Sequence, residues 1–266
     1  MQVSEPAPFS GRSSPITGAA ALLTISRLLL RANMRSRHRR TLLGYLWLAI
    51  PGMASAFAFS LLRKGQLLAV GEVAMPYPLF VLSGVFLWQA FVDALIVPTQ
   101  HLVQQRRFLS LVAAPFEAVV IAAAGEVLIN LAIRMAILAA AMLVFGQAPD
   151  SAWLLLPCAG LAMVAIGLVL GLYVAPFAQL YDDVASLVSM AATFGIFLVP
   201  IFYPVPAESG FASNPFAWIL DDARGAMIGD FGGATPLWII LVSAALLVPA
   251  WLFNAASRPH IAARAY

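Results

Sequence analysis

The stretch TISRLLLRANMRSRHRRTLLGYLW, residues 24–47, is a basic amphipathic segment that leads directly into hydrophobic sequence. A helix drawn through it carries polar and basic residues along one side at spacings of three and four, namely Thr24, Arg27, Arg31, Arg35 and His38. Leucine, isoleucine and methionine occupy much of the remaining surface. This pattern predicts an amphipathic helix over residues 24–42 that lies on a membrane surface, with its arginines near anionic lipid phosphates. A simpler interpretation is that the basic residues only fix the topology of the first membrane span.

The composition is that of a membrane protein. Hydrophobic residues make up 62% of the chain and charged residues 10%, with a mean hydropathy of +0.91. These values lie far from soluble averages and predict an all-α integral membrane protein. The formal net charge of +3 says little by itself, but the basic residues are mostly arginines placed unevenly along the chain, which indicates membrane orientation; no nucleic acid is therefore expected as a partner. Residues 1–23, which are polar and lack the apolar core of a signal peptide, are predicted to form a disordered cytoplasmic leader.

Six apolar stretches reach the length of about 20 residues that a membrane-crossing helix needs. They cover residues 43–62, 79–99, 117–145, 152–178, 184–203 and 236–253. We therefore expect six transmembrane helices within residues 43–256, and a cytoplasmic tail over residues 257–266. Eleven of the 15 lysine and arginine residues then fall on one side, which predicts that both termini are cytoplasmic. These eleven are Arg12, Arg27, Arg31, Arg35, Arg37, Arg39, Arg40, Arg106, Arg107, Arg258 and Arg264.

The second predicted span contains Asp93, and the third contains Glu126, Asn130 and Arg134 at spacings of four. Each ionised group costs about 2.5–3.5 kcal/mol at the centre of a membrane helix, so these groups are expected to face protein or water. Counting residues from the cytoplasmic ends places Asp93 and Glu126 at similar depth, and Arg134 leans toward Glu126. We predict one ion-pair cluster, which either locks the helix bundle or lines a transport route.

Two further features concern helix contacts and the external side. Gly167 and Gly171 in the fourth span form a small-xxx-small pattern, which predicts a close helix contact and leaves a subunit interface open. After the fifth span, Asn214 and Pro215 have the residue types of a helix cap and a first helical position. The segment that follows is predicted to be a short external re-entrant helix, with Asp221, Asp222 and Arg224 on its polar side.

Sequence motifs of catalysis are missing. There is no GxxxxGK[ST] phosphate loop, and the three histidines lie outside the predicted spans without metal-ligand spacing. Cys158 is the only cysteine and has no histidine near it in the sequence. We therefore expect no catalytic residue and no metal site, and an enzyme is an improbable interpretation.

Several short motifs follow the order and spacing of one transporter family. LLGYLW leads from the basic helix into a first span that contains Pro51. Asp182-Asp183-Val184 is similar to an Arg-Asp-Val that starts the family's fifth span. Pro200-Ile201-Phe202-Tyr203 is similar to the family's Pro-x-x-Tyr. Asn214-Pro215 with Arg224-Gly225 is similar to its external Asn-Pro…Arg region. The chain thus resembles the permease subunit of ABC-2 type transporters, nearest to exporters of O-antigen, capsular polysaccharide or teichoic acid.

The resemblance implies an ABC-2 (type V exporter) fold in a bacterial inner (cytoplasmic) membrane. It implies a homodimer that works with two copies of a separate cytoplasmic ATPase subunit. ATP and Mg would be bound by that partner, so this chain is expected to hold no cofactor itself. The cargo would be a lipid-linked polysaccharide that moves from the cytoplasmic to the periplasmic side.

The resemblance also suggests roles for particular residues. The segment 100–116 resembles a coupling helix that docks on the ATPase through Gln104, Arg106 and Arg107, although an ordinary charged turn fits its sequence equally well. The basic helix resembles a gate helix, whose cations would bind a pyrophosphate headgroup: Arg27, Arg31, Arg35, Arg37, Arg39 and Arg40. Aromatic side chains available to line a carbohydrate channel are Phe57, Phe59, Phe86, Trp88, Phe91, Phe194, Phe197 and Phe202, some of which serve only for packing.

Two alternative functions stay open at this point. One is an ABC-2 exporter of a drug or a small lipid. The other is an ion-coupled secondary carrier, suggested by the intramembrane Asp93, Glu126 and Arg134. The first needs a soluble ATPase for activity, whereas the second responds to an ion gradient alone.

Overall fold

The computed structural model describes residues 18–38, 44–67, 71–109, 115–204, 213–230 and 233–263. Within these ranges every regular element is a helix. In chain order they are α1 (Ala19–His38), the 3₁₀ helix η1 (Gly44–Leu48), α2 (Ile50–Lys64), α3 (Tyr77–Leu109), α4 (Phe116–Val144), the 3₁₀ helix η2 (Ser151–Leu154), α5 (Leu155–Leu180), α6 (Asp182–Gly195), the 3₁₀ helix η3 (Ile196–Leu198), α7 (Pro215–Met227) and α8 (Thr235–Ala263).

Four helical stretches among the described residues are long and apolar enough to cross a membrane, which agrees with the prediction of an all-α membrane protein. They are Tyr77–Gln104, Phe116–Val144, Ser151–Leu180 and Thr235–Arg258. The other two predicted spans form shorter helices, α2 with 15 residues and α6 with 14. At about 1.5 Å per residue each covers roughly 21–22 Å, less than the ~30 Å of a bilayer core.

Local backbone chemistry explains these two short helices. Gly44 has a φ of 48°, in the left-handed region, so a continuous helix cannot run through it, and Pro51 stands in the first turn of α2. The helical segment after α6 ends because Val199 is extended ahead of Pro200, as expected for a residue that precedes proline. Only the two 3₁₀ helices, η1 and η3, lengthen these segments.

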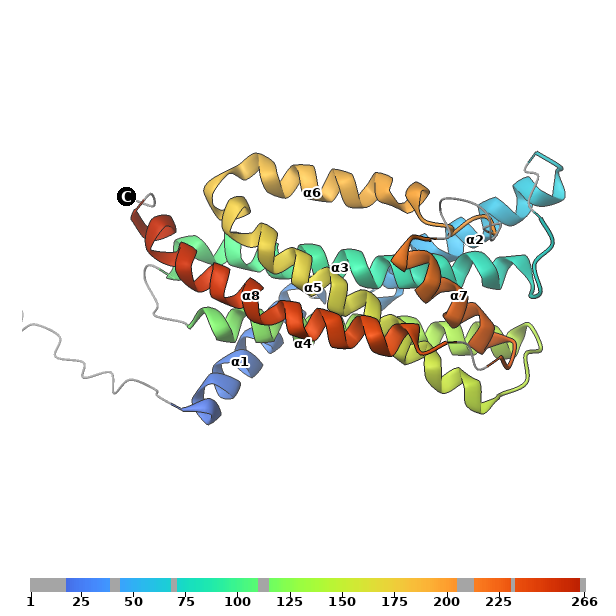
Figure 1. Cartoon of the computed structure of the whole chain (residues 1–266), viewed down its shortest axis with the longest axis horizontal. Coiled ribbons are helices and arrows are strands. Elements are labelled where there is room, and N and C mark those ends of the chain that lie inside the picture. The colour runs from blue at the N-terminus through green and yellow to red at the C-terminus, as the bar shows by residue number, and fades with distance from the viewer. Residues whose placement is uncertain are drawn as a thin grey trace, which may run out of the picture.

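The helices form an elongated bundle with α3 near its middle (Figure 1). α3 packs most extensively on α5, which also packs on α8, while α4 and α2 cover other sides of α3. α1 lies obliquely against α4 at the end of the bundle where α8 finishes, and α7 lies at the opposite end (Figure 1). At the end where α8 finishes, Arg258 of α8 forms an ion pair with Glu117 of α4 at 2.7 Å.

Glycines allow α3 and α5 to approach closely. An added Cβ at Gly167 would lie 2.4 Å from the carbonyl oxygen of Phe91, and one at Gly171 would lie 2.7 Å from that of Leu95. The predicted close contact is therefore confirmed, and its partner is α3 of the same chain rather than another subunit. Thr99 of α3 adds a hydrogen bond from its hydroxyl to the carbonyl of Gly171 at 3.2 Å.

Gly167→Ala is expected to destabilise the protein by about 1–3 kcal/mol, because the added methyl group overpacks the contact against fixed backbone atoms. The measurement is the unfolding of the purified protein in detergent, followed by tryptophan fluorescence. Gly225→Ala is the matched control, since a Cβ there would meet only Asp230, at 3.7 Å or more, and alanine favours helix. Equal unfolding temperatures for Gly167→Ala and the native protein would contradict this account of the contact.

Candidate functional site

The outer side of α1 carries a row of exposed arginines. Arg27, Arg31 and Arg35 are exposed, and none of them forms an ion pair with a described carboxylate. They repeat every fourth residue, so their guanidinium groups share one side of the helix. Of the other predicted headgroup residues, Arg39 and Arg40 lie outside the described residues, as does the side chain of Arg37.

The apolar surface of α1 is divided between protein and surroundings. Ser26 is buried, and Leu30 contacts Gly125 of α4, where an added Cβ would lie 3.1 Å from the leucine side chain. Leu23 and Leu28 remain 48% and 60% exposed. The helix therefore docks on α4 with one edge and keeps both arginines and leucines on its outer surface, the arrangement of an interfacial helix.

A polar contact joins the three helices α1, α3 and α4. His101 of α3 lies with its Nε2 atom 3.0 Å from Oε2 of Glu126 on α4. On the other side of the ring, Nδ1 is 3.4 Å from the amide nitrogen of Asn33 on α1. Glu126 is fully buried, so its carboxylate depends on such polar partners.

A second polar contact lies farther along the same two helices. Arg134 of α4 forms an ion pair with Asp93 of α3 at 2.9 Å, and Asn130 donates a hydrogen bond to the same carboxylate oxygen at 3.1 Å. Arg134 is buried, whereas 23% of the Asp93 side chain is exposed. Asp93, Asn130 and Arg134 are thus brought together as predicted.

Glu126 does not join that cluster, which corrects the expected geometry. The two contacts, 93 with 134 and 101 with 126, lie eight residues apart on each helix, or about 12 Å along its axis. The predicted depths were wrong because α3 continues as a helix to Leu109, ten residues beyond the expected end of the span at residue 99. This extension also brings His101, which was placed outside the spans, level with Glu126.

The predicted coupling segment, residues 100–116, begins as the last turns of α3, which ends at Leu109. Gln104 is exposed, and Arg106 and Arg107 belong to the last turns of α3, although their side chains are not described. α4 begins at Phe116, directly after Pro115 and one residue before the predicted start of the third span at residue 117. Residues 110–114 are outside the described ranges.

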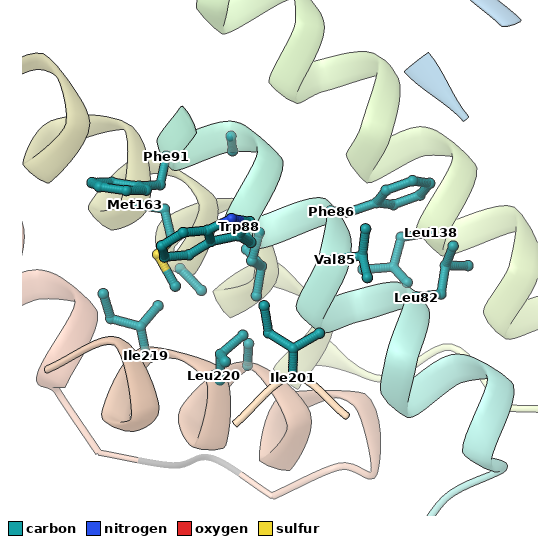
Figure 2. Close-up of a cluster of buried hydrophobic side chains, with 14 of the residues drawn as sticks. Leu82, Val85, Phe86, Trp88, Phe91, Leu138, Met163, Ile201, Ile219 and Leu220 are labelled. Atoms are coloured by element: carbon teal, nitrogen blue, oxygen red, sulfur yellow. The ribbon is translucent and has the colours of Figure 1, made fainter. Parts of the chain in front are cut away.

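The aromatic residues proposed for a channel fall into two groups. Phe86, Trp88, Phe91 and Phe202 are buried in the core. Figure 2 shows Trp88 and Phe86 on opposite sides of α3, Trp88 near Met163 and Phe86 toward Leu138. Phe59 is partly buried and stacks on Phe202 at 3.9 Å between ring centroids. Phe57, Phe194 and Phe197 are exposed by 68%, 64% and 60%, so these three on α2, α6 and η3 are the ones that an external molecule can reach.

The end of the bundle that carries α7 contains a buried cation that the sequence pattern placed on the surface. Arg224 of α7 is only 7% exposed and donates hydrogen bonds to the carbonyl oxygens of Pro200 at 3.0 Å, Ile201 at 3.1 Å and Phe80 at 3.3 Å. Its guanidinium also lies 3.5 Å from the ring centroid of Phe80. Burial lowers the pKa of Arg224 to about 9, which leaves the group protonated at neutral pH.

The start of α7 agrees with the sequence. The Asn214 side chain accepts a hydrogen bond from the backbone N–H of Phe216 at 3.0 Å, and Pro215 is the first helical residue. Ile219 and Leu220 then point into the core beside Ile201 (Figure 2). Among the described residues, no group of three or more His, Cys, Asp or Glu side chains is arranged to hold a metal ion. No protein-family model and no curated protein matches the chain.

Proposed function

We propose that this chain is the membrane permease subunit of an ATP-driven exporter, working as a homodimer with two copies of a separate cytoplasmic ATPase. The single observation that supports it best is the arginine row on α1. These cations lie on a helix docked at the end of the bundle that also holds the α8 terminus and the last turns of α3 (Figure 1). Among the described residues, that end carries most of the lysines and arginines, which favours the cytoplasmic side of a bacterial inner membrane.

Six crossings are compatible with the helix lengths once the 3₁₀ helices are included. η1 adds five residues ahead of α2, and η3 adds three after α6. At about 2 Å per residue these lengthen the two segments to roughly 32 Å and 27 Å. The first segment would then span a bilayer core of about 30 Å and the second would come within about 3 Å of doing so, which leaves both termini in the cytoplasm.

The proposed cargo is a lipid-linked polysaccharide. Its pyrophosphate headgroup would bind the arginines of α1 at the cytoplasmic surface, because guanidinium groups form paired, charge-assisted hydrogen bonds with phosphate oxygens. The sugar chain would pass along exposed aromatic rings such as Phe57, Phe194 and Phe197. Hydrolysis of ATP, with its Mg, belongs to the partner subunit.

The test is ATPase activity of the protein reconstituted in lipid bilayers with a co-encoded ATPase, with and without a lipid-pyrophosphate-linked oligosaccharide. We expect a stable complex whose activity changes with the glycolipid. Replacing Arg27, Arg31 and Arg35 together by glutamine should raise the half-maximal glycolipid concentration by about tenfold or more, since charged hydrogen bonds to phosphate are lost. Lys64→Gln, which removes an exposed cation at the far end of α2, is the matched control and should change nothing.

Other outcomes separate the alternatives. A complex whose ATPase activity does not change with the glycolipid would contradict the polysaccharide cargo and favour a drug or small-lipid exporter. Transport driven by an ion gradient without any ATPase would contradict the whole proposal. In that case the Asp93–Arg134 and His101–Glu126 pairs would become the candidate coupling sites.

A further inference from the structure

The contact between α1 and the bundle has a polar centre at His101. We propose that His101 is a positioning residue that holds α1 against α4 and thereby fixes the position of the arginine row, Arg27, Arg31 and Arg35. Only the use of those arginines for phosphate rests on the proposed function. The docking of α1 is a property of the fold and is tested without cargo or ATPase.

The hydrogen-bonding capacities of the three side chains define the link. The amide nitrogen of Asn33 only donates, so in the observed orientation Nδ1 of His101 accepts from it. The ring proton then lies on Nε2, which donates to Oε2 of Glu126 at 3.0 Å. His101 therefore connects a donor on α1 to a buried carboxylate on α4. The bond to Asn33, at 3.4 Å, is the longer and weaker of the two.

The α1 contact has an apolar part and a polar part. Leu29 packs against the cluster of Leu102, Val119 and Ala175, and the link through His101 supplies the hydrogen bonds. The arginines of the row form no ion pair with a described carboxylate, and the leucines at 23 and 28 are about half exposed. Docking therefore depends on the edge that contains Ser26, Leu29, Leu30 and Asn33. α5, which also packs on α3, brings no carboxylate, lysine, arginine or histidine to the site, so Glu126 is the charged partner of the ring.

The experiment uses full-length protein in which Cys158→Ser removes the only native cysteine. Ser26→Cys then reports docking, because residue 26 is 3% exposed, and Thr24→Cys on the exposed side of α1 is the reference. We expect His101→Leu to raise the maleimide labelling rate of the thiol introduced at position 26, relative to the thiol at position 24, by about two- to tenfold, the change that follows loss of a hydrogen bond between neutral groups. His101→Gln should restore slow labelling, since its amide both donates and accepts.

A second measurement follows the same motion by distance. Spin labels at Arg31→Cys on α1 and Leu143→Cys at the far end of α4 occupy exposed positions. The distance distribution should be narrow in the parent and His101→Gln proteins and broad in His101→Leu. Asp93→Asn is the control, because it weakens the other polar contact between α3 and α4 and should leave both readouts unchanged.

Three results would overturn the inference. One is slow labelling and a narrow distribution in His101→Leu. Another is an equal effect of Asp93→Asn, which would indicate general loosening of the bundle. The third is failure of His101→Gln to restore docking, which would show that the ring acts by its shape alone. None of these results bears on whether an ATPase or a glycolipid binds, so this inference and the proposed function fail separately.

Discussion

Asp93→Leu is expected to destabilise the protein by about 3–5 kcal/mol, the usual cost of removing one partner from a buried ion pair. Arg134 is 3% exposed and would keep its charge inside the bundle without its carboxylate. Arg134→Met should cost less, because Asp93 is 23% exposed and still accepts the hydrogen bond from Asn130. The measurement is the free energy of unfolding in mixed micelles with an increasing SDS fraction.

The double variant Asp93→Leu/Arg134→Met completes the comparison. With both charges gone, an apolar pair fills the site, and its stability should lie above that of Asp93→Leu alone. Additive losses would show that the two side chains do not stabilise each other. If neutralising Asp93 instead abolished transport while stability, assembly and ATPase activity were intact, the pair would belong to the transport route rather than to the lock between α3 and α4.

The sequence predicts the features that depend on local chemistry. Asn214 and Pro215 start α7, because capping and proline geometry act within a few residues. The glycines of α5 indicate a close contact because only small residues let backbones approach. The exposed arginines of α1 follow from helical spacing alone.

The register between helices could not be predicted in the same way. Hydropathy marks where the apolar part of α3 ends, but the helix continues through polar residues to Leu109. The pairing of His101 with Glu126 follows from that extension, and the only signal in the sequence was a histidine just beyond a span. α2 and α6 were predicted as full spans because a hydropathy profile does not reveal the helix break at Gly44 or the extended Val199 ahead of Pro200.

Helical periodicity predicted an exposed position for Arg224, and this prediction was wrong. Its neighbours Asp221 and Asp222 suggested a polar side for Arg224, yet Arg224 is buried together with the apolar Ala223, Ala226 and Met227. The signal that could have found it is Gly84 on α3. An added Cβ there would lie 3.1 Å from the guanidinium and 3.0 Å from Ile201, so the missing side chain makes room for both.

Arg224→Met should release the segment around Pro200 from α3 and α7, with a loss of about 3–6 kcal/mol if two hydrogen bonds from a charged donor contribute about 1.5–3 kcal/mol each. The carbonyls of Pro200 and Ile201 lose the donor that joins them to α7. Phe80 suffers less, because its carbonyl also accepts from the hydroxyl of Ser83 at 3.0 Å. Hydrogen exchange should therefore accelerate in residues 199–204 and in α7, and the unfolding temperature should fall.

Two control variants define what Arg224 contributes. Arg224→Lys keeps the charge but loses the planar fork that reaches several carbonyls at once, so its exchange should fall between those of Arg224→Met and the native protein. Asp221→Asn removes an exposed neighbouring charge and should leave exchange unchanged. Native exchange in Arg224→Met would contradict the role of the guanidinium, because the carbonyls of Pro200 and Ile201 would then keep their order without it. Native exchange in Arg224→Lys alone would assign that role to the charge rather than to the fork.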